Sequence, residues 1–332
     1  MRERPLSGRR PRMPTRLVER CRLPLRILLS TPFADWVERG LVRWVRHAPY
    51  NARFVGGIVQ EITRHKTTSL TFRLGAGPLM TVPPISEGVS LYVVGALFAE
   101  RATTAYLSRI LRPGMVFLDV GANMGFYTLL GAQRVGATGR VIAFEPFPVL
   151  AAHIRSSIEI NGFGDRACLE ECAVSAIHNE SVTFYAGPLD NTGASSLLPH
   201  GWLNTGTQVT VRTTRLDDYL TTHGITQVDV MKIDIEGAEM LAFRGMARTL
   251  QERPPRVLVV ELFPSDQFVA EDTTRHASDQ ASIPTHVYDL LQSHGYTCLE
   301  IEPDGQVGRV CSREEIQNIM RVDNYAFVQP DR

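Results

Sequence analysis

The sequence predicts an α/β protein whose main domain is a doubly wound, mostly parallel β-sheet. From about residue 97 onward, short apolar segments rich in β-branched residues alternate with longer segments of helical periodicity. The apolar run 115–120 ends in an acid and passes through a turn of small residues into a helical segment. The composition, with 44% hydrophobic and 21% charged residues, is that of an ordinary globular protein.

Charge is distributed unevenly along the 332 residues, although 35 basic and 35 acidic side chains balance over the whole chain. Residues 1–50 contain twelve arginines, no lysine and four acids, which leaves a net charge of +8. The other residues carry 23 basic and 31 acidic side chains, a net charge of −8. We therefore expect a basic arm at 1–50, a small β lead-in at 51–96 and the main domain at 97–332.

Two features bear on the location of the protein. No run of about 18 apolar residues occurs, so no segment is expected to span a bilayer. The five cysteines are odd in number and include no C-x-x-C pair, which argues against a zinc ribbon and a disulfide framework. These observations favour a cytoplasmic protein.

The arm is expected to contain one amphipathic helix. Thr31 and Pro32 supply an N-cap and a proline at the first helical position, and apolar residues recur at helical spacing up to about Arg46. A basic amphipathic helix can pack against its own protein or make peripheral contact with an anionic membrane surface, and the sequence leaves both open.

The remaining elements follow from apolar runs, helical spacing and the positions of glycine and proline. Pro148 and Pro284 stand at the starts of helices, and Gly295 follows the end of one. The predicted strands are 54–62, 69–74, 79–82, 115–120, 140–145, 169–174, 181–185, 209–213, 228–233, 257–262, 296–302 and 323–329. The predicted helices of the main domain are 97–111, 125–133, 148–161, 216–223, 237–251 and 284–294.

The turn after the strand 115–120 carries the strongest functional signal. Gly121 and Gly125 can take backbone dihedrals that side chains forbid and would let a ligand approach closely. Their spacing is G-x-x-x-G rather than the G-x-G-x-x-G of a dinucleotide loop, and Asp119 would repel a diphosphate. Glu145 ends the next strand of this βαβ arrangement and can accept hydrogen bonds from both hydroxyls of a ribose. A cationic group, a ribose and no phosphate together describe S-adenosylmethionine.

On these residues the sequence resembles the FkbM-type methyltransferases, over about 112–328. The segments that carry the resemblance are 119–128 (DVGANMGFYT), 144–146 (FEP), 195–197 (SSL), 216–218 (LDD), 232–239 (KIDIEGAE) and 324–328 (NYAFV). The resemblance implies the class I, Rossmann-like methyltransferase fold with a seven-stranded sheet whose last strand is antiparallel. It also implies O-methylation of a hydroxyl with S-adenosylmethionine as cofactor.

The roles that the resemblance implies for the cofactor fall on a few positions. Asp119 and Gly121 would flank the methionine moiety, within a loop that also contains Asn123 and Gly125, and Glu145 would bind the ribose. Cys172 and Ala173, at the end of the third strand, would offer backbone to the adenine.

The strand 228–233 supplies candidate catalytic residues. Lys232 and Asp234 are two residues apart and so share one face of the strand. Glu236 follows in the turn, and Glu261 ends the next strand. A lysine inside a buried strand needs a carboxylate partner, and Asp234 is the nearest. Because methyl transfer from a sulfonium needs alignment and a proton acceptor, the four residues Asp234, Lys232, Glu236 and Glu261 are the candidates for catalysis.

Other assignments at this edge stay open. Asp234, Glu236 and Glu261 could hold Mg²⁺, although a metal is not expected. His200 and His286 adjoin the two long loops, 186–207 and 265–283, and are the histidines to test as bases. Loops of this length favour a substrate-binding role, for which Asn191, Ser195 and Ser196 are the candidates.

The function that the sequence predicts is an S-adenosylmethionine-dependent O-methyltransferase acting on a hydroxyl of a sugar, glycan or polyketide-like metabolite. The alternatives are a cofactor-binding module without transfer activity and an NAD-linked oxidoreductase, which Asp119 opposes. The expected partner is the small-molecule or glycan acceptor. A nucleic acid is not expected, because the basic residues are concentrated in the arm. The oligomeric state is left open.

Overall fold

The computed structural model describes most of the main domain and part of the lead-in. Its described residues are 69–74, 77–83, 100–187, 192–199, 207–264 and 284–330. The predicted arm with its helix and the predicted strand 54–62 lie outside these residues. Residues 63–332 form one compact unit, to which all the described residues belong.

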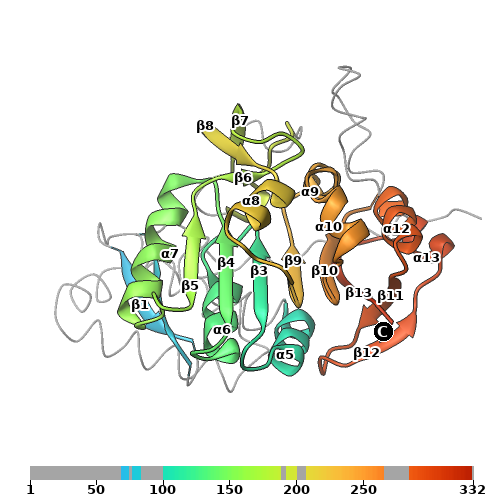
Figure 1. Ribbon diagram of the computed structural model, residues 1–332, viewed down its shortest axis with the longest axis horizontal. Coiled ribbons are helices and arrows are strands. Elements are labelled where there is room, and N and C mark those ends of the chain that lie inside the picture. The colour runs from blue at the N-terminus through green and yellow to red at the C-terminus, as the bar shows by residue number, and fades with distance from the viewer. Residues whose placement is uncertain are drawn as a thin grey trace, which may run out of the picture. The chain divides into compact units, whose positions relative to one another are not determined.

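A central sheet of eight strands organises the domain, in the order β12-β11-β13-β10-β9-β3-β4-β5 (Figure 1). From β10 to β5 neighbouring strands are parallel, whereas β13 runs antiparallel between β10 and β11. The strands are β3 (Val116–Val120), β4 (Arg140–Phe144), β5 (Ala167–Glu170), β9 (Val230–Ile233), β10 (Val257–Leu262), β11 (Thr297–Ile301), β12 (Val307–Val310) and β13 (Asp323–Val328). The doubly wound, mostly parallel sheet is as predicted.

The eighth strand, β12, departs from the seven that the family resemblance implied. It pairs with β11 as an edge hairpin. Val307 and Val310 are 43% and 62% exposed, so the strand has no buried face to impose an alternating apolar pattern. Helix α13 (Arg313–Gln317) follows it and was also missed, although Ser312 and Glu315 form a capping box at its start.

Helices cover both faces of the sheet (Figure 1). Leu107, Leu129 and Leu150 belong to one apolar cluster, on the face of β3 that carries Phe117. Leu220 and Leu291 belong to the second cluster, on the opposite face. The helices of the first face are α5 (Arg101–Ile110), α6 (Phe126–Val135) and α7 (Pro148–Ile160). Those of the second face are α8 (Leu216–Thr222), α9 (Glu239–Gly245), α10 (Ala247–Glu252) and α12 (Pro284–Ser293).

The predicted strand 169–174 is divided between two sheets. β5 ends at Glu170, and β6 (Ala173–Val174) joins β8 (Thr207–Thr214) and β7 (Ser181–Ala186) in a small sheet of order β6-β8-β7. At the break, Glu170 accepts a hydrogen bond from Tyr219 at 2.8 Å while Glu171 pairs with Arg155 at 2.7 Å. Each of the two consecutive acids thus has its own partner where the chain leaves the central sheet.

The predicted helix 237–251 is likewise two helices, α9 and α10, with the break at Met246. A Cβ at Gly245 would collide with the backbone carbonyl of Ser175. Gly245 therefore lets the end of α9 approach the chain after β6, at a position where a continuous helix of larger residues would not fit.

A hairpin of β1 (Leu70–Arg73) and β2 (Leu79–Val82) represents the lead-in. The backbone N–H groups of Leu79 and Thr81 donate to Asn161 Oδ1 at 2.8 Å and to Ser157 Oγ at 2.9 Å. Both acceptors lie at the end of α7, which anchors the hairpin. Within the described residues, no helix combines the length and the apolar character needed to cross a bilayer.

Candidate functional site

The turn after β3, residues 121–125, is called here the glycine loop. Gly121, Asn123 and Gly125 all have positive φ, at 83°, 52° and 84°. A Cβ at Gly121 would collide with the carbonyl oxygen of Asp234, and one at Gly125 would lie 3.0 Å from Ile154. The two glycines are therefore required by packing within the protein itself. The predicted close approach of a ligand to them stays a prediction.

Glu145, directly after β4, is tied to the glycine loop. One carboxylate oxygen accepts the N–H of Asn123 at 2.8 Å, and the other accepts the N–H of Phe147 at 2.9 Å. Burial raises the pKa of Glu145 to about 8, although both hydrogen bonds oppose this. Since a carboxylate offers about four lone-pair directions, two acceptor positions remain, which suits the diol of a ribose.

Asp119 is buried on the face of β3 that is covered by α6. It accepts a hydrogen bond from Thr128 Oγ1 at 2.6 Å and is the register partner of Lys232 on β9. Burial raises the pKa of Asp119 to about 6, against the effects of Lys232 and Thr128. A buried carboxylate beside the glycine loop is chemically suited to a cationic ligand such as S-adenosylmethionine.

Lys232, 2% exposed, is held between two partners. Its ammonium forms an ion pair with Asp234 and lies 4.8 Å from the centre of the Tyr127 ring. Tyr127 in turn donates a hydrogen bond to Glu100 at 2.5 Å. The expected Lys232–Asp234 pair is present. In the sequence Tyr127 stands out only as part of the segment 119–128, and no signal points to Glu100, which precedes α5.

Asp234, Glu236 and Glu261, called here the carboxylate cluster, come together at the carboxyl ends of β9 and β10. One oxygen from each lies within 4.8 Å of the others. Burial would raise the pKa of Asp234, but Lys232 holds it below the ordinary value. Burial and the Asp234 carboxylate raise the pKa of Glu236 and of Glu261 well above the ordinary range. Lys232 offsets the charge of only one carboxylate, so Glu236 and Glu261 keep a strong tendency to bind protons or a cation.

The remaining cofactor candidates lie beside β5. The third strand of the prediction ends at Glu170, so Cys172 is in the connection between two sheets and Ala173 begins β6. Burial raises the pKa of the Cys172 thiol to about 12, which makes it an inert thiol. The expected contact of these two residues with adenine stays a prediction.

The serines proposed to face the substrate use their hydroxyls within the protein. Ser195 Oγ donates to the carbonyl of Thr192 at 2.8 Å and accepts the N–H of Gly187 at 2.9 Å. Ser196 is 1% exposed and accepts the N–H of Leu198 at 3.1 Å. Thr192, which the sequence did not single out, donates to Asn123 Oδ1 at 2.8 Å and so joins this segment to the glycine loop.

Three further candidates were expected in or beside the two long loops. Asn191 and His200 lie outside the described residues. His286 is exposed on α12, which covers the face of the sheet opposite to Lys232.

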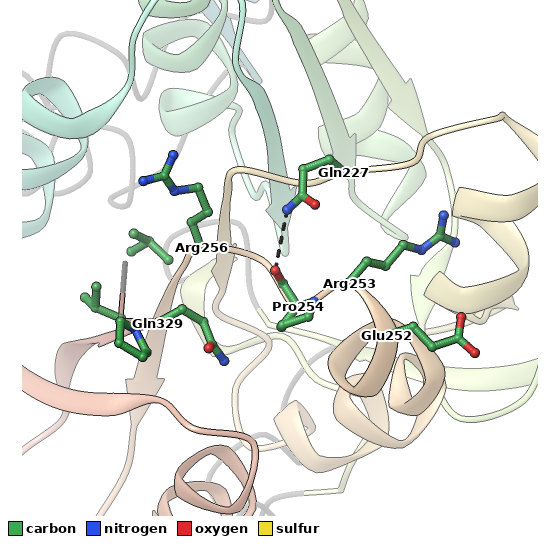
Figure 2. A pocket seen from close by; sticks show the side chains of 9 residues that line it. Gln227, Glu252, Arg253, Pro254, Arg256 and Gln329 are labelled. Atoms are coloured by element: carbon green, nitrogen blue, oxygen red, sulfur yellow. Dashed lines mark hydrogen bonds between the residues drawn. The ribbon is translucent and has the colours of Figure 1, made fainter. Parts of the chain in front are cut away.

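A cavity of about 430 Å³ lies at the other end of the strands (Figure 2). Gln227, Arg253, Arg256 and Gln329 are among its lining residues, and Gln227 donates to the carbonyl of Pro254 at 3.5 Å. Val257, the first residue of β10, also lines it, whereas the carboxylate cluster lies at the carboxyl ends of β9 and β10. The cavity is therefore separate from the candidate site.

Comparison with known proteins shows what the chain is similar to. The family model described as the methyltransferase FkbM domain matches residues 119–298. The 31-O-demethyl-FK506 methyltransferase FkbM of Streptomyces tacrolimicus is 28% identical over 253 residues, which cover 68% of this chain and 88% of that protein. The 2-O-methyltransferase NoeI of Sinorhizobium fredii is 26% identical over 193 residues, which cover 50% of this chain and 77% of that protein. The solved O-methyltransferase from Bacillus cereus in complex with SAH aligns with a TM-score of 0.39 at 16% identity, over 70% of this chain and 81% of that chain.

The strand order, the glycine loop after β3 and the acid after β4 are those of a class I methyltransferase that depends on S-adenosylmethionine. Because the family model matches more than half of the residues, the chain belongs to the FkbM methyltransferase family.

Proposed function

We propose that this methyltransferase transfers the methyl group to a hydroxyl oxygen of a sugar, glycan or polyketide-like metabolite. The observation that carries the proposal is the contact between the glycine loop and β9, where Gly121 packs on the backbone of Asp234. A methyl donor bound at the loop would be next to the carboxylate cluster, where an acceptor hydroxyl could lose its proton.

The names of two relatives support oxygen as the acceptor atom. The relative from Streptomyces tacrolimicus is named for a 31-O-demethyl substrate, and NoeI is named a 2-O-methyltransferase. Both have low sequence identity to this chain, so the oxygen acceptor and its chemical class are part of the proposal.

The residues of the site suit the needs of this reaction. S-adenosylmethionine, when bound, supplies a methyl group already activated by the sulfonium. The protein has to align the acceptor and take up one proton. Asp234 is a poor base because Lys232 lowers its pKa, whereas the raised pKa values of Glu236 and Glu261 make these two carboxylates the stronger proton acceptors of the cluster.

The experiment is a transfer assay with cofactor that carries a deuterated methyl group. The full chain is incubated with separate panels of free sugars, oligosaccharides and hydroxylated macrolides, and products are analysed by mass spectrometry and NMR. The expected product is a methyl ether on a carbon-bound oxygen. Methylation on nitrogen or carbon would contradict the proposal, as would tight cofactor binding without turnover on any panel.

A further inference from the structure

The end of β13 that lies beside the carboxylate cluster carries Asn324, a residue with no role in the site described so far. Asn324 is directly opposite Glu261 in the antiparallel pair of β13 and β10. Opposed residues in such a pair project from the same face of the sheet. Val259 and Ala326, two residues from Glu261 and Asn324, lie in the apolar cluster of the face that carries Phe117. Asn324 therefore points to the same face as Glu261, Lys232 and Asp234.

Two oxygens at this point lack hydrogen-bond donors. Asn324 is 7% exposed, and among the described residues neither its Oδ1 nor Glu261 Oε2 has a hydrogen-bond partner. A buried acceptor without a donor is unfavourable, and more so when it is charged. Such atoms normally bind a water, a proton or a cation.

The charges favour a cation of charge two. The carboxylate cluster can carry three negative charges, and Lys232 supplies one positive charge from within the same group. A divalent cation would offset this excess of negative charge, to which Asp119 and Glu100 also contribute near Lys232. Its ligands would be three carboxylates and one amide carbonyl, all oxygen, which hard cations such as Mg²⁺ prefer over nitrogen and sulfur donors.

We propose that Asp234, Glu236, Glu261 and Asn324 form a binding site for a hard divalent cation, with Mg²⁺ as the expected occupant. The site joins the carboxyl ends of β9 and β10 to the start of β13. The binding of the cation does not depend on the proposed function. The further role that we give it, to hold the acceptor oxygen, does rest on that function.

The test measures binding to the full chain after treatment with EDTA and dialysis. Mn²⁺ serves as the probe in electron paramagnetic resonance, and Mg²⁺ is titrated in competition. We expect about one Mn²⁺ per chain, displaced by Mg²⁺. Asn324→Ala and Glu261→Gln should each weaken binding about tenfold or more, and Asn324→Asp should tighten it because it adds a charged ligand. The matched control is Glu159→Gln, an exposed acid on α7 that should bind as the wild type does.

Each outcome decides the proposal. Absence of saturable Mn²⁺ binding to the wild type at millimolar concentration would overturn it without the need for any variant. Equal binding in Asn324→Ala, Asn324→Asp and wild type would overturn it as well. Methyl transfer that continues unchanged in EDTA would remove the role of the cation but leave the proposed function intact. If the chain binds Mn²⁺ at the site but transfers no methyl group, the cation site stands and the proposed function is contradicted.

Discussion

The carbonyl oxygen of Asp234 occupies the space that a Cβ atom at Gly121 would need. The backbone that presents the carboxylate cluster and the loop expected to hold the cofactor are therefore in direct contact. A displacement of one has to move the other, so we expect cofactor binding at the loop and catalysis at the cluster to be coupled.

Gly121→Ala tests this contact. Gly162→Ala is the matched control, since Gly162 also has positive φ, at 63°, but a Cβ there would meet nothing within 4 Å. The two variants share the cost of the left-handed backbone, so the difference between them isolates the collision. We expect Gly121→Ala to lower the free energy of unfolding by about 1–3 kcal/mol more than the control, measured by urea denaturation. Equal stability of the two variants would mean that the loop can move away from β9.

Glu145→Gln should weaken cofactor binding. The amide group would turn an N–H donor toward either Asn123 or Phe147, both of which donate to this side chain. The turned amide also offers the ribose fewer acceptor positions, and a buried hydrogen bond lost there costs about 1–3 kcal/mol, so the Kd for S-adenosylhomocysteine should rise about tenfold in calorimetry. The exposed acid variant Glu180→Gln should bind like the wild type. An unchanged Kd in Glu145→Gln would exclude Glu145 from the cofactor site.

The raised pKa of Asp119 predicts that cofactor affinity depends on pH. Its pKa of about 6 in the free protein means that the carboxyl takes up a proton as the pH falls through this value and loses its charge. Affinity for the cationic S-adenosylmethionine should therefore rise between pH 5 and 7, and this rise should be absent in Asp119→Asn. Thr128→Val removes the hydrogen bond that stabilises the charged form, so it should move the midpoint to higher pH. A wild-type affinity that is flat over this range would rule out an ionised Asp119 beside the cofactor.

Lys232→Met should separate catalysis from cofactor binding. The change leaves Asp234 without its counter-charge next to two other carboxyls, and the loss of one partner of a buried pair costs about 3–5 kcal/mol. We expect kcat to fall strongly while the Kd for S-adenosylhomocysteine changes little, with both measured below the unfolding temperature. Lys232→Arg should not restore kcat, because a guanidinium does not fit between Tyr127 and Asp234 as an ammonium does. Full activity of Lys232→Met would exclude a part for Lys232 in the reaction.

The sequence could predict those features that depend on neighbouring residues in the chain. The alternation of strands and helices identified the sheet, and the two-residue spacing of Lys232 and Asp234 identified their ion pair. Asn324 could not be assigned in this way, since its position beside Glu261 depends on the insertion of β13 between β10 and β11. The hydrogen bonds of the Ser195 hydroxyl could not be predicted either, because its partners are backbone groups of Thr192 and Gly187. Contacts set by topology or by loop backbone leave no periodic trace in the sequence.

The position of β13 also constrains the order in which the domain can be completed during synthesis. β13 follows β11 and β12 in the chain but lies between β10 and β11 in the sheet. A nascent chain that has emerged only as far as β12 has two unpaired strand edges facing a gap, and such edges invite pairing with other chains. The strand that carries Asn324 closes that gap, so β13 has to emerge from the ribosome before the sheet is continuous. Chaperone contact during translation should accordingly be strongest in the interval between the emergence of β11 and that of β13.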